Sequence, residues 1–398
     1  MTVDQLLTAD VEPPAEEHPP PPASADLVRS SFALIEPRAE EVGRAFYAGL
    51  FGLAPATRAM FPVNMQVQRS RLLRALVHVV QQVDRPEVMV PFLEQLGRDH
   101  RKFGVVGEHY EAVGTALLNA LRGVAGPAWT PAVHRAWSEA YAVVAGAMRT
   151  AAEAERGPAG RLGQVVGHRR IGWDIAVVTV RAEEPVPYLA GQYVSVETPQ
   201  RPRLWRYLSP ANAPRPDGLL EFHVRAVDGG WVSRAVVAHT AVGDVWRIGP
   251  PMGRMHLEPD TGRDLLMVAG GTGYAPVKAV IEELARRPRR PATQVFVGGR
   301  SWDDLYDLAA LRELSYRHPW LDVVAVVEGD IDAGRPADGE APAAEQGTLA
   351  DVVTRYGAWA DHDVLVSGSP AMIRSTVSRM LVAGTPLDRI RYDPFTMD

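Results

Sequence analysis

The chain has 398 residues, of which 46% are hydrophobic and 23% are charged, a composition typical of a globular protein with two or three domains. A formal net charge of -6 argues against binding to nucleic acid or to an anionic membrane. Because cysteine is absent, disulfides, cysteine-ligated iron–sulfur clusters and thiolate-ligated haem are excluded, and any metal must bind His, Asp, Glu, Tyr or Met.

The N-terminal segment differs in composition from the rest of the chain. Residues 11–25 are rich in proline and glutamate and are too polar to pack into a core, so we predict a disordered tail over residues 1–25. The N-terminus lacks a basic region followed by an apolar core, and no apolar stretch is long enough to span a bilayer. We therefore expect a cytoplasmic protein.

Between residues 26 and 156 apolar residues recur at the spacing of amphipathic helices, which predicts an all-helical domain. Five helices are marked by Val42, Phe46, Leu50 and Leu53; by Leu72, Leu76, Val80 and Val83; by Phe92, Leu96, His100 and Phe103; by Tyr110, Val113, Leu117 and Leu121; and by Val133, Trp137, Tyr141, Val144 and Met148.

The pattern changes near Gly157 to short alternating runs, which predict an antiparallel β-barrel over residues 157–262. Beyond it, alternating strand-like and helix-like segments predict a doubly wound α/β domain over residues 263–398. The expected barrel strands are 175–180, 193–196, 220–227 and 245–248; the expected α/β elements are 265–269, 276–286, 294–297, 305–314, 321–327, 364–366 and 370–382.

A glycine loop follows the first strand of the α/β domain. Gly270-Gly271-Thr272-Gly273 is followed by Pro276, which suits the first turn of a helix. Glycines let the main chain approach a pyrophosphate, and the helix N-terminus offers free amides and a positive dipole. The loop predicts a nucleotide phosphate site, although such glycine turns also serve structure alone and the spacing is not G-x-G-x-x-G.

Five motifs follow one another in a characteristic order between residues 160 and 398. They are Gly191-Gln192-Tyr193, Arg206-Tyr207-Leu208-Ser209-Pro210, Gly229-Gly230-Trp231-Val232-Ser233, the glycine loop, and Ser367-Gly368-Ser369-Pro370. In this order they resemble the ferredoxin reductase superfamily, whose barrel binds FAD or FMN and whose second domain binds NAD(P)H. The resemblance implies FAD and NADH as cofactors, with NADPH as the alternative.

The resemblance also implies roles for particular residues. Arg206 would bind the flavin pyrophosphate, Ser209 would hydrogen-bond the isoalloxazine, and the amides of Val232 and Ser233 would bind phosphates. The other implied cofactor contacts are Tyr193, Tyr207, Leu208, the glycine loop, Ser367 in the place of a family cysteine, and Asp393 and Phe395 near the C-terminus.

One position departs from the superfamily pattern. The family reads Arg-x-Tyr-Ser with the tyrosine stacked on the flavin, whereas Leu208 occupies that position here and Tyr207 precedes it. The residues alone also allow Arg206 and Tyr207 to be an ordinary strand pair.

The residues after strand 321–327 bear on the choice of nicotinamide cofactor. Phosphate-selective members of the superfamily carry a serine and a basic residue there, whereas this chain has Glu328-Gly329-Asp330. These carboxylates would repel a 2′-phosphate, so we predict a preference for NADH. Arg300 is the counterargument, unless it is a surface residue paired with Asp303 or Asp304.

His100 is the candidate iron ligand of the helical domain. A reductase must pass its electrons on, and without cysteine the natural acceptor is histidine-ligated haem. His100 shares an apolar face with Leu96 and Phe103, although a lone histidine there is more often a core residue. The set Tyr47, Phe61, Gln68, Leu72, His100 and Tyr110 is similar, in order, to the haem-pocket positions of bacterial globins, and the whole chain resembles a flavohaemoglobin.

The flavohaemoglobin resemblance implies haem b with His100 as the proximal iron ligand. Phe61 and Leu72 would contact the porphyrin, Tyr47 and Gln68 would hydrogen-bond bound oxygen, and Tyr110 would lie behind His100. Tyr47 and Gln68 could equally be packing and surface residues. Rival histidine ligands outside the motif are His78, His109 and His134.

Two haem-pocket positions depart from the family pattern. Ala152 stands where a glutamate usually joins the proximal histidine and tyrosine, with Glu153 beside it, and Asp99 replaces a basic residue before His100. Both changes would affect ligand basicity or electron transfer.

The resemblance implies a nitric oxide dioxygenase, in which NAD(P)H reduces FAD, FAD reduces haem, and nitric oxide and O2 become nitrate. One alternative is a flavohaem oxidoreductase acting on a peroxide or an organic acid, suggested by Ala152 and Leu208. Another is a haem-based oxygen or redox sensor. The expected partners are O2 and nitric oxide, with no nucleic acid, transmembrane segment or obligatory protein partner.

Overall fold

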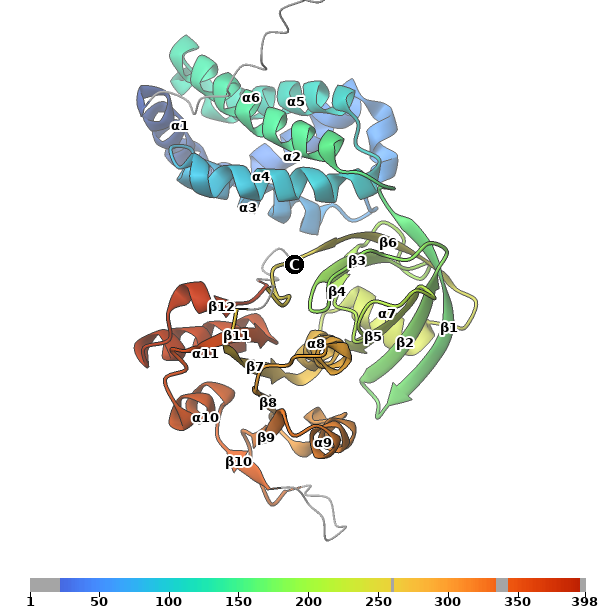
Figure 1. Cartoon of the computed structure of the whole chain (residues 1–398). Coiled ribbons are helices and arrows are strands. Elements are labelled where there is room, and N and C mark those ends of the chain that lie inside the picture. The colour runs from blue at the N-terminus through green and yellow to red at the C-terminus, as the bar shows by residue number, and fades with distance from the viewer. Residues whose placement is uncertain (1–21, 259–260, 334–342, 394–398) are drawn as a thin grey trace, which may run out of the picture. The chain divides into compact units, whose positions relative to one another are not determined.

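The computed structural model describes residues 22–258, 261–333 and 343–393 (Figure 1). The chain divides into two compact units, Met1–Gly157 and Pro158–Asp398. Each unit has its own hydrophobic core, so we describe each by itself.

The first unit is helical, as the sequence predicted. Its helices are α1 Pro22–Ile35, α2 Ala39–Leu53, α3 Gln66–Gln82, α4 Pro86–His100, α5 Gly107–Ala125 and α6 Pro131–Ala154, with short 3-10 segments at Glu36–Arg38, Pro55–Met60, Arg101–Phe103 and Gly126–Ala128. The five expected helices correspond to α2 through α6.

Helix α1 corrects the prediction of a tail that reaches residue 25. The helix begins at Pro22, a residue that suits a first helical turn, and it buries Val28, Phe32 and Ile35 in the core of the unit. Residues 1–21 lie outside the described part of the chain.

Close packing of α4 on α6 holds the end of α4 in place. A Cβ atom on Gly97 would lie 2.1 Å from the carbonyl oxygen of Met148, so only glycine permits this approach of the two main chains. Gly97 is one turn before His100, and the contact therefore fixes the turn that carries the predicted iron ligand.

The second unit begins with the predicted antiparallel barrel. Its strands are β1 Arg161–Ile171, β2 Ile175–Ala182, β3 Tyr193–Glu197, β4 Arg206–Leu208, β5 Leu219–Arg225 and β6 Val245–Met252, in the order β4-β3-β6-β1-β2-β5. An isolated bridge between Pro210 and Phe222 brings the two edge strands together. Helix α7, Trp231–His239, follows β5, and apolar side chains that include Phe222 and Trp246 fill the interior.

The parallel α/β part has the predicted architecture. Its strands are β7 Asp264–Gly270, β8 Thr293–Gly299, β9 Leu321–Val327, β10 Ala344–Gln346, β11 His362–Ser367 and β12 Ile390–Arg391; its helices are α8 Tyr274–Arg286, α9 Leu308–Arg317, α10 Leu349–Tyr356 and α11 Pro370–Val382. The predicted helices 276–286 and 305–314 therefore begin at Tyr274 and Leu308 instead.

The strand order β10-β9-β8-β7-β11-β12 determines where a nucleotide can bind. Leu265 and Met267 face α8 and α9, whereas Leu266 and Val268 face α10 and α11. Successive strands lead outward from β7 on one side, and β11 pairs with β7 on the other. The carboxyl ends of β7 and β11 therefore form the switch point at which open α/β sheets bind ligands.

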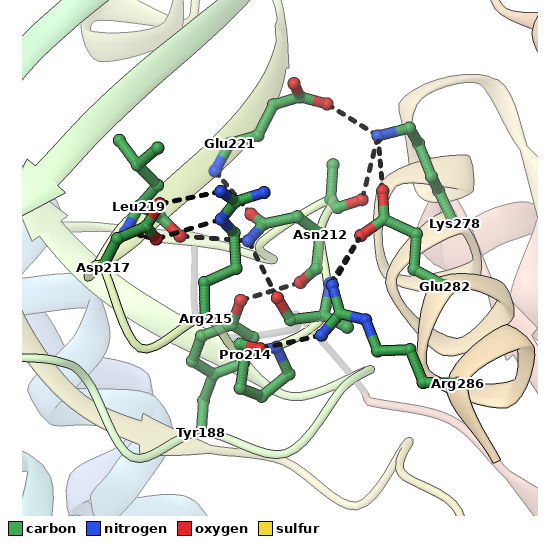
Figure 2. Close-up of polar contacts among 12 residues, drawn as sticks. Tyr188, Asn212, Pro214, Arg215, Asp217, Leu219, Glu221, Lys278, Glu282 and Arg286 are labelled. Atoms are coloured by element: carbon green, nitrogen blue, oxygen red, sulfur yellow. Dashed lines mark hydrogen bonds and ion pairs between the residues drawn. The ribbon is translucent and has the colours of Figure 1, made fainter.

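A polar seam joins the barrel to helix α8, as Figure 2 shows. Lys278 of α8 places its Nζ atom 2.9 Å from Glu221 of β5 and 3.3 Å from Glu282. The Glu282 carboxylate also accepts the main-chain amide of Ala213 over 3.0 Å. The seam fixes the direction of β5 with respect to the first helix of the α/β part.

Candidate functional site

Aromatic side chains form one wall of the candidate haem pocket. The ring of Tyr47 on α2 lies 5.4 Å from that of Phe61 and 5.9 Å from that of Phe51, measured between centroids. Leu72 on α3 packs against the same cluster. The Tyr47 hydroxyl donates to the main-chain carbonyl of Gln68 over a long 3.3 Å. Burial raises the pKa of Tyr47, which keeps the phenol protonated as a donor.

His100 ends helix α4 and is half-buried. Its Nδ1 atom lies 2.7 Å from the carbonyl oxygen of Leu96, one turn earlier. Because a carbonyl only accepts, we assign the proton to Nδ1, which leaves the Nε2 lone pair for a metal. Burial lowers the pKa of His100 and favours the neutral form. This imidazole and the aromatic wall fit a globin haem.

A buried ion pair lies next to His100 in the sequence. The Nζ atom of Lys102 is 2.6 Å from Asp99 Oδ1, and the two side chains are only 2% and 10% exposed. Lys102 also lies over the ring of Phe103, which meets the His100 ring edge-on at 5.8 Å. Lys102 therefore neutralises the acidic charge that Asp99 introduces.

Tyr110 on α5 packs against the small core cluster of Met89, Leu93 and Met148, as Leu96 of α4, the helix that carries the predicted ligand, also does. Its hydroxyl is buried and has no hydrogen-bond partner among the described residues. Burial also raises the pKa of Tyr110. A buried hydroxyl without a partner is costly, which is consistent with a site that a bound group completes.

The rival histidines occupy different environments. His109 uses its Nδ1 to accept the amide of Val106 at the start of α5, over 3.1 Å, and His134 is exposed. The His78 ring lies 4.4 Å from the Phe92 ring, tilted by 54°, and its Nε2 is buried without a partner in the described structure. His78 is therefore the remaining rival to His100.

The barrel separates two residues that the sequence assigned jointly to the flavin. Strands β3 and β4 pair Val194 with Leu208 and Ser195 with Tyr207. Since side chains alternate between faces, Leu208 shares the face of buried Val194 and packs against the barrel core. Tyr207 lies on the opposite face, where its ring is 5.1 Å from that of Tyr193.

Arg206 is the first residue of β4, and Ser209 directly follows the strand. Arg206 donates from Nη1 to the carbonyl of Trp205 over 2.8 Å and is half-buried, as is Ser209. Arg206 pairs opposite Val196, so it lies on the same face of β4 as Leu208.

Asp393 converges with Tyr193 on Gly253. A Cβ atom on Gly253, whose φ is +101°, would lie 2.5 Å from the Asp393 carboxylate and 2.8 Å from the Tyr193 ring. The amide of Arg254 donates to Asp393 Oδ1 over 2.8 Å, and burial raises the pKa of Asp393 to about 6. Phe395, the other predicted residue of this segment, lies outside the described residues.

The start of α7 offers main-chain donors. The Ser233 hydroxyl donates to the carbonyl of Gly230 over 3.3 Å and accepts the amide of Val227 over 3.4 Å. The helical ladder begins with the Arg234 amide, so the amides of Val232 and Ser233 precede the first intrahelical bond. The amides, rather than the Ser233 hydroxyl, suit phosphate oxygens.

The glycine loop forms a 3-10 turn, Gly271–Gly273, between β7 and α8. A Cβ atom on Gly273 would lie 2.6 Å from the carbonyl of Ser367, and one on Gly270 would lie 2.9 Å from Met372. Ser367 is buried at the end of β11, and Thr272 is half-buried. The loop and Ser367 thus meet at the switch point.

The predicted specificity residues lie side by side at the ends of β8 and β9. The amide of Glu328 donates to Gly299 over 2.9 Å, and both Glu328 and Arg300 are exposed. The suggested side-chain pair of Arg300 with Asp303 or Asp304 is wrong. Asp304 instead accepts the main-chain amide of Arg300 over 2.8 Å and binds the guanidinium of Arg225.

Comparison with known proteins supports the reading of three modules. The globin family matches residues 44–148, the oxidoreductase FAD-binding domain matches residues 163–257, and the oxidoreductase NAD-binding domain matches residues 267–378. A flavohemoprotein of Bordetella parapertussis is 30% identical over 283 residues, which are 66% of this chain and 70% of that protein. The chain belongs to the flavohemoprotein family.

Other flavohemoproteins align over almost the whole chain. The flavohemoprotein of Bacillus subtilis is 23% identical over 391 residues, 93% of this chain and 96% of that protein. The crystal structure of flavohemoglobin from Malassezia yamatoensis with bound FAD and heme covers 94% of this chain and 98% of its own, with a TM-score of 0.76 and 19% identity. At this identity the structural likeness shows the fold.

Membership of the flavohemoprotein family confirms the predicted fold class and the cofactors haem, FAD and NAD. The protein is an oxidoreductase in which a flavin- and nicotinamide-binding reductase serves a globin haem. Within the described ranges, no helix combines the length and apolar character needed to cross a membrane.

The predicted departures from the flavohemoprotein pattern coincide with missing or altered hydrogen bonds of Tyr110 and His100. Ala152 is half-buried on α6 and Glu153 is exposed, while the Tyr110 hydroxyl has no hydrogen-bond partner in the described structure. The His100 imidazole is held by the Leu96 carbonyl. A carbonyl is a weaker hydrogen-bond acceptor than a carboxylate. An imidazole that donates Nδ1–H to a carbonyl is therefore a weaker electron donor to a metal at Nε2.

Sequence reasoning missed two residues near these sites, Lys102 and Arg225, and named Asp304 only as a possible partner of Arg300. The spacing of Asp99 and Lys102, three residues apart on a helix, could have suggested their ion pair. Nothing local could have joined Arg225 to Asp304, because they lie on distant segments of the chain.

Proposed function

We propose that the chain is a nitric oxide dioxygenase that consumes NADH, O2 and nitric oxide and releases nitrate. The observation that carries the proposal is the buried, protonated Tyr47 hydroxyl, which makes only a long bond of 3.3 Å to Gln68 among the described residues. Such a phenol can turn toward a ligand with partial negative charge and stabilise it.

The remaining roles follow from the placement of each residue. When bound, NADH, FAD and haem supply hydride transfer, one-electron transfer and oxygen chemistry. His100 would hold the iron through Nε2, and Phe61 and Leu72 would line the porphyrin. The further predicted contacts are Tyr110 behind His100; Tyr193, Tyr207, Arg206, Ser209, Val232, Ser233 and Asp393 for FAD; and Gly270, Gly271, Thr272, Gly273 and Ser367 for NADH.

Three further points stay predictions within this proposal. The domain limits 157–262 and 263–398 stay predictions, as does the end of the first domain at residue 156, while its start moves from residue 26 to Pro22, where α1 begins. Leu208 is the least supported flavin contact, because it packs against the barrel core while Tyr207 faces the other way. The cytoplasmic location stays a prediction.

A haem-based oxygen or redox sensor is the second candidate function. Two observations favour it: the Tyr110 hydroxyl has no hydrogen-bond partner in the described structure, and His100 Nδ1 bonds to a main-chain carbonyl. Both reduce the electron donation from the imidazole to a bound iron, which oxygen chemistry needs. A third function, reduction of a peroxide or an organic acid, needs that donation most and is supported least.

The decisive experiment compares substrates on the purified protein loaded with haem and FAD. Steady-state turnover with NADH would be measured for nitric oxide in air, for hydrogen peroxide, for an alkyl hydroperoxide and for hydroxy acids. We expect nitric oxide consumption with nitrate as product and one NADH used for two nitric oxide molecules, since each requires one electron. Faster turnover of a peroxide, or slow turnover of every substrate, would contradict the proposal and favour the second or third function.

A further inference from the structure

His223 is a buried histidine on the outer face of the barrel. It lies on β5 between Phe222 and Val224, whose side chains belong to the barrel core, so its imidazole points the other way and is only 2% exposed. Its Nε2 lies 2.9 Å from Glu221 Oε1, on the same face of β5. Its Nδ1 lies 2.7 Å from the hydroxyl of Tyr306, which precedes α9. The imidazole therefore joins the barrel to a segment of the α/β part 83 residues away.

The partners of His223 determine where its proton lies. The Glu221 carboxylate also accepts a hydrogen bond from Lys278 Nζ at 2.9 Å in the polar seam (Figure 2). These hydrogen bonds, that from His223 first, lower the pKa of Glu221 to about 2. An ionised carboxylate only accepts, so the proton is on Nε2 and Nδ1 is an acceptor. The Tyr306 hydroxyl therefore donates its proton to His223 Nδ1.

Tyr306 connects this hydrogen bond to the glycine loop. Its ring meets the ring of Tyr274 edge-on, with 6.5 Å between the centroids. Tyr274 is the first residue of α8 and directly follows Gly273. Tyr306, Tyr274 and Gly271 also line one small recess at the carboxyl end of β7. The Tyr306 ring thus lies against the residue that follows the loop predicted to bind the coenzyme.

The main chain around His223 leads to the predicted flavin contact Ser209. The residue after Ser209 forms an isolated bridge with Phe222, the neighbour of His223 on β5. The amide of Ala211 donates to the carbonyl of Glu221 over 2.7 Å. Strand β5 therefore holds the segment that carries Ser209 through its main chain and holds the α/β part through the His223 side chain.

We infer that His223 is a positioning residue for hydride transfer, because its hydrogen bond to Tyr306 fixes the glycine loop with respect to the segment that carries Ser209. Hydride transfer depends strongly on geometry, since a displacement of about 1 Å between reacting groups can slow a reaction by about 100-fold. Little water reaches the imidazole, so little water competes for the bond. The inference rests on the proposed contacts of Ser209 and the glycine loop and holds whatever the haem substrate is.

Two variants of His223 separate its two hydrogen bonds. The Asn side chain places an amide oxygen near the position of Nδ1, so His223→Asn keeps an acceptor for Tyr306 and loses the bond to Glu221. The longer Gln side chain places its amide near the position of Nε2, so His223→Gln keeps the bond to Glu221 and loses the bond to Tyr306. Tyr306→Phe removes the hydroxyl alone. Tyr316→Phe, at a tyrosine of α9 that is 89% exposed, is the matched control.

The measurements use full-length protein loaded with FAD and haem. Anaerobic stopped-flow mixing would give the limiting rate of flavin reduction by NADH, and calorimetry would give the affinity for ADP-ribose. Tyr306→Phe and His223→Gln should each slow flavin reduction by about tenfold and leave ADP-ribose affinity within about twofold of wild type, because ADP-ribose lacks the nicotinamide that must reach the flavin. His223→Asn should recover most of the lost rate, and Tyr316→Phe should match the wild type.

A spectroscopic signature tests the geometry without turnover. NAD+ stacked on a reduced flavin gives a long-wavelength charge-transfer absorption, which would be recorded beyond the haem bands after reduction with dithionite. Its intensity should fall in Tyr306→Phe and His223→Gln and return in His223→Asn. The double variant His223→Gln with Tyr306→Phe should be no worse than either single variant, because both changes remove the same hydrogen bond.

Two outcomes would overturn the inference. One is a Tyr306→Phe variant with the wild-type reduction rate and charge-transfer absorption. The other is an equal loss in His223→Asn and His223→Gln, which indicates a packing role alone. If His223→Gln loses FAD, Tyr306→Phe decides, since it deletes one hydroxyl outside the barrel. A wild type whose flavin NADH does not reduce would overturn the proposed function together with this inference, whereas nitric oxide turnover does not enter the test.

Discussion

The two units differ in which polar groups are buried and paired near their sites. In the reductase unit, Asp393 is bonded to the Arg254 amide and Arg225 is held between carboxylates. In the helical unit, the Tyr110 hydroxyl and His78 Nε2 are buried without partners among the described residues. These charged groups of the reductase site are therefore paired within the protein, whereas the unpaired polar atoms of the globin site are ones that a bound group could pair. The reductase unit also has buried atoms without a partner among the described residues, such as the Tyr274 hydroxyl beside the glycine loop, which is an uncharged group.

The largest effect should come from removing the iron ligand. His100→Ala should abolish stable haem binding and leave FAD bound, because the two cofactors occupy separate units. Haem and flavin absorption of the purified variant, before and after NADH, would show this. His134→Ala changes an exposed histidine and should keep the wild-type spectrum. A wild-type haem spectrum in His100→Ala would move the ligand to His78.

The pH dependence of stability should reveal the cost of burying the Asp393 carboxylate in the reductase unit. Burial raises the pKa of Asp393 from 3.8 to about 6, so the folded state holds the proton more tightly than the unfolded state. Its contribution to stability is full below the unfolded pKa and is lost as pH rises through 6. The difference in unfolding free energy between wild type and Asp393→Asn should therefore shift by about 2 kcal/mol between pH 4 and pH 7.

Denaturant unfolding at several pH values, followed by flavin release, would measure this shift. Asp393→Asn keeps a side-chain oxygen for the Arg254 amide, so the variant isolates the charge. A pH-independent difference between the two proteins would show that Asp393 titrates normally.

The donor in the globin pocket should have a smaller, kinetic effect. Tyr47→Phe should speed oxygen dissociation by roughly 10- to 100-fold, because a hydrogen bond to a charged acceptor is worth about 1.5 to 3 kcal/mol. Flash photolysis or stopped-flow mixing of the reduced protein would give the rate. Tyr141→Phe removes another partly buried hydroxyl of the same unit, one that donates to the Tyr110 carbonyl, and should leave the off-rate unchanged.

The contrast between the units also shows what sequence can predict. Helices α2 to α6 and strand β9 were found because their periodicity is local. The sequence did not predict helix α1, although Val28, Phe32 and Ile35 have helical spacing. The proline-rich run before it is typical of disorder, and the last proline of that run, Pro22, is also the first residue of the helix. Helix α10 is short and lacks a distinguishing motif, so its amphipathic pattern was overlooked.

Side-chain environments could be predicted less well than elements. The haem-pocket set from Tyr47 to Tyr110 came from motif order, yet that order does not show that Leu96 holds His100 or that Lys102 neutralises Asp99. The separation of Tyr207 from Leu208 depends on the register of β3 and β4, which only pairing defines.

The choice between NADH and NADPH should show the smallest effect, since it depends on exposed charges. Glu328 and Arg300 lie side by side and are both exposed, so each acts on a 2′-phosphate through screened interactions. The wild type should prefer NADH because Glu328 and Asp330 outnumber Arg300. Glu328→Gln should raise kcat/KM for NADPH by about threefold to tenfold and leave that for NADH nearly unchanged. The ratio of kcat/KM values for the two cofactors is the measurement, with Arg300→Gln as the opposing variant. A wild type that favours NADPH, and loses that preference in Arg300→Gln, would show that the arginine outweighs both carboxylates.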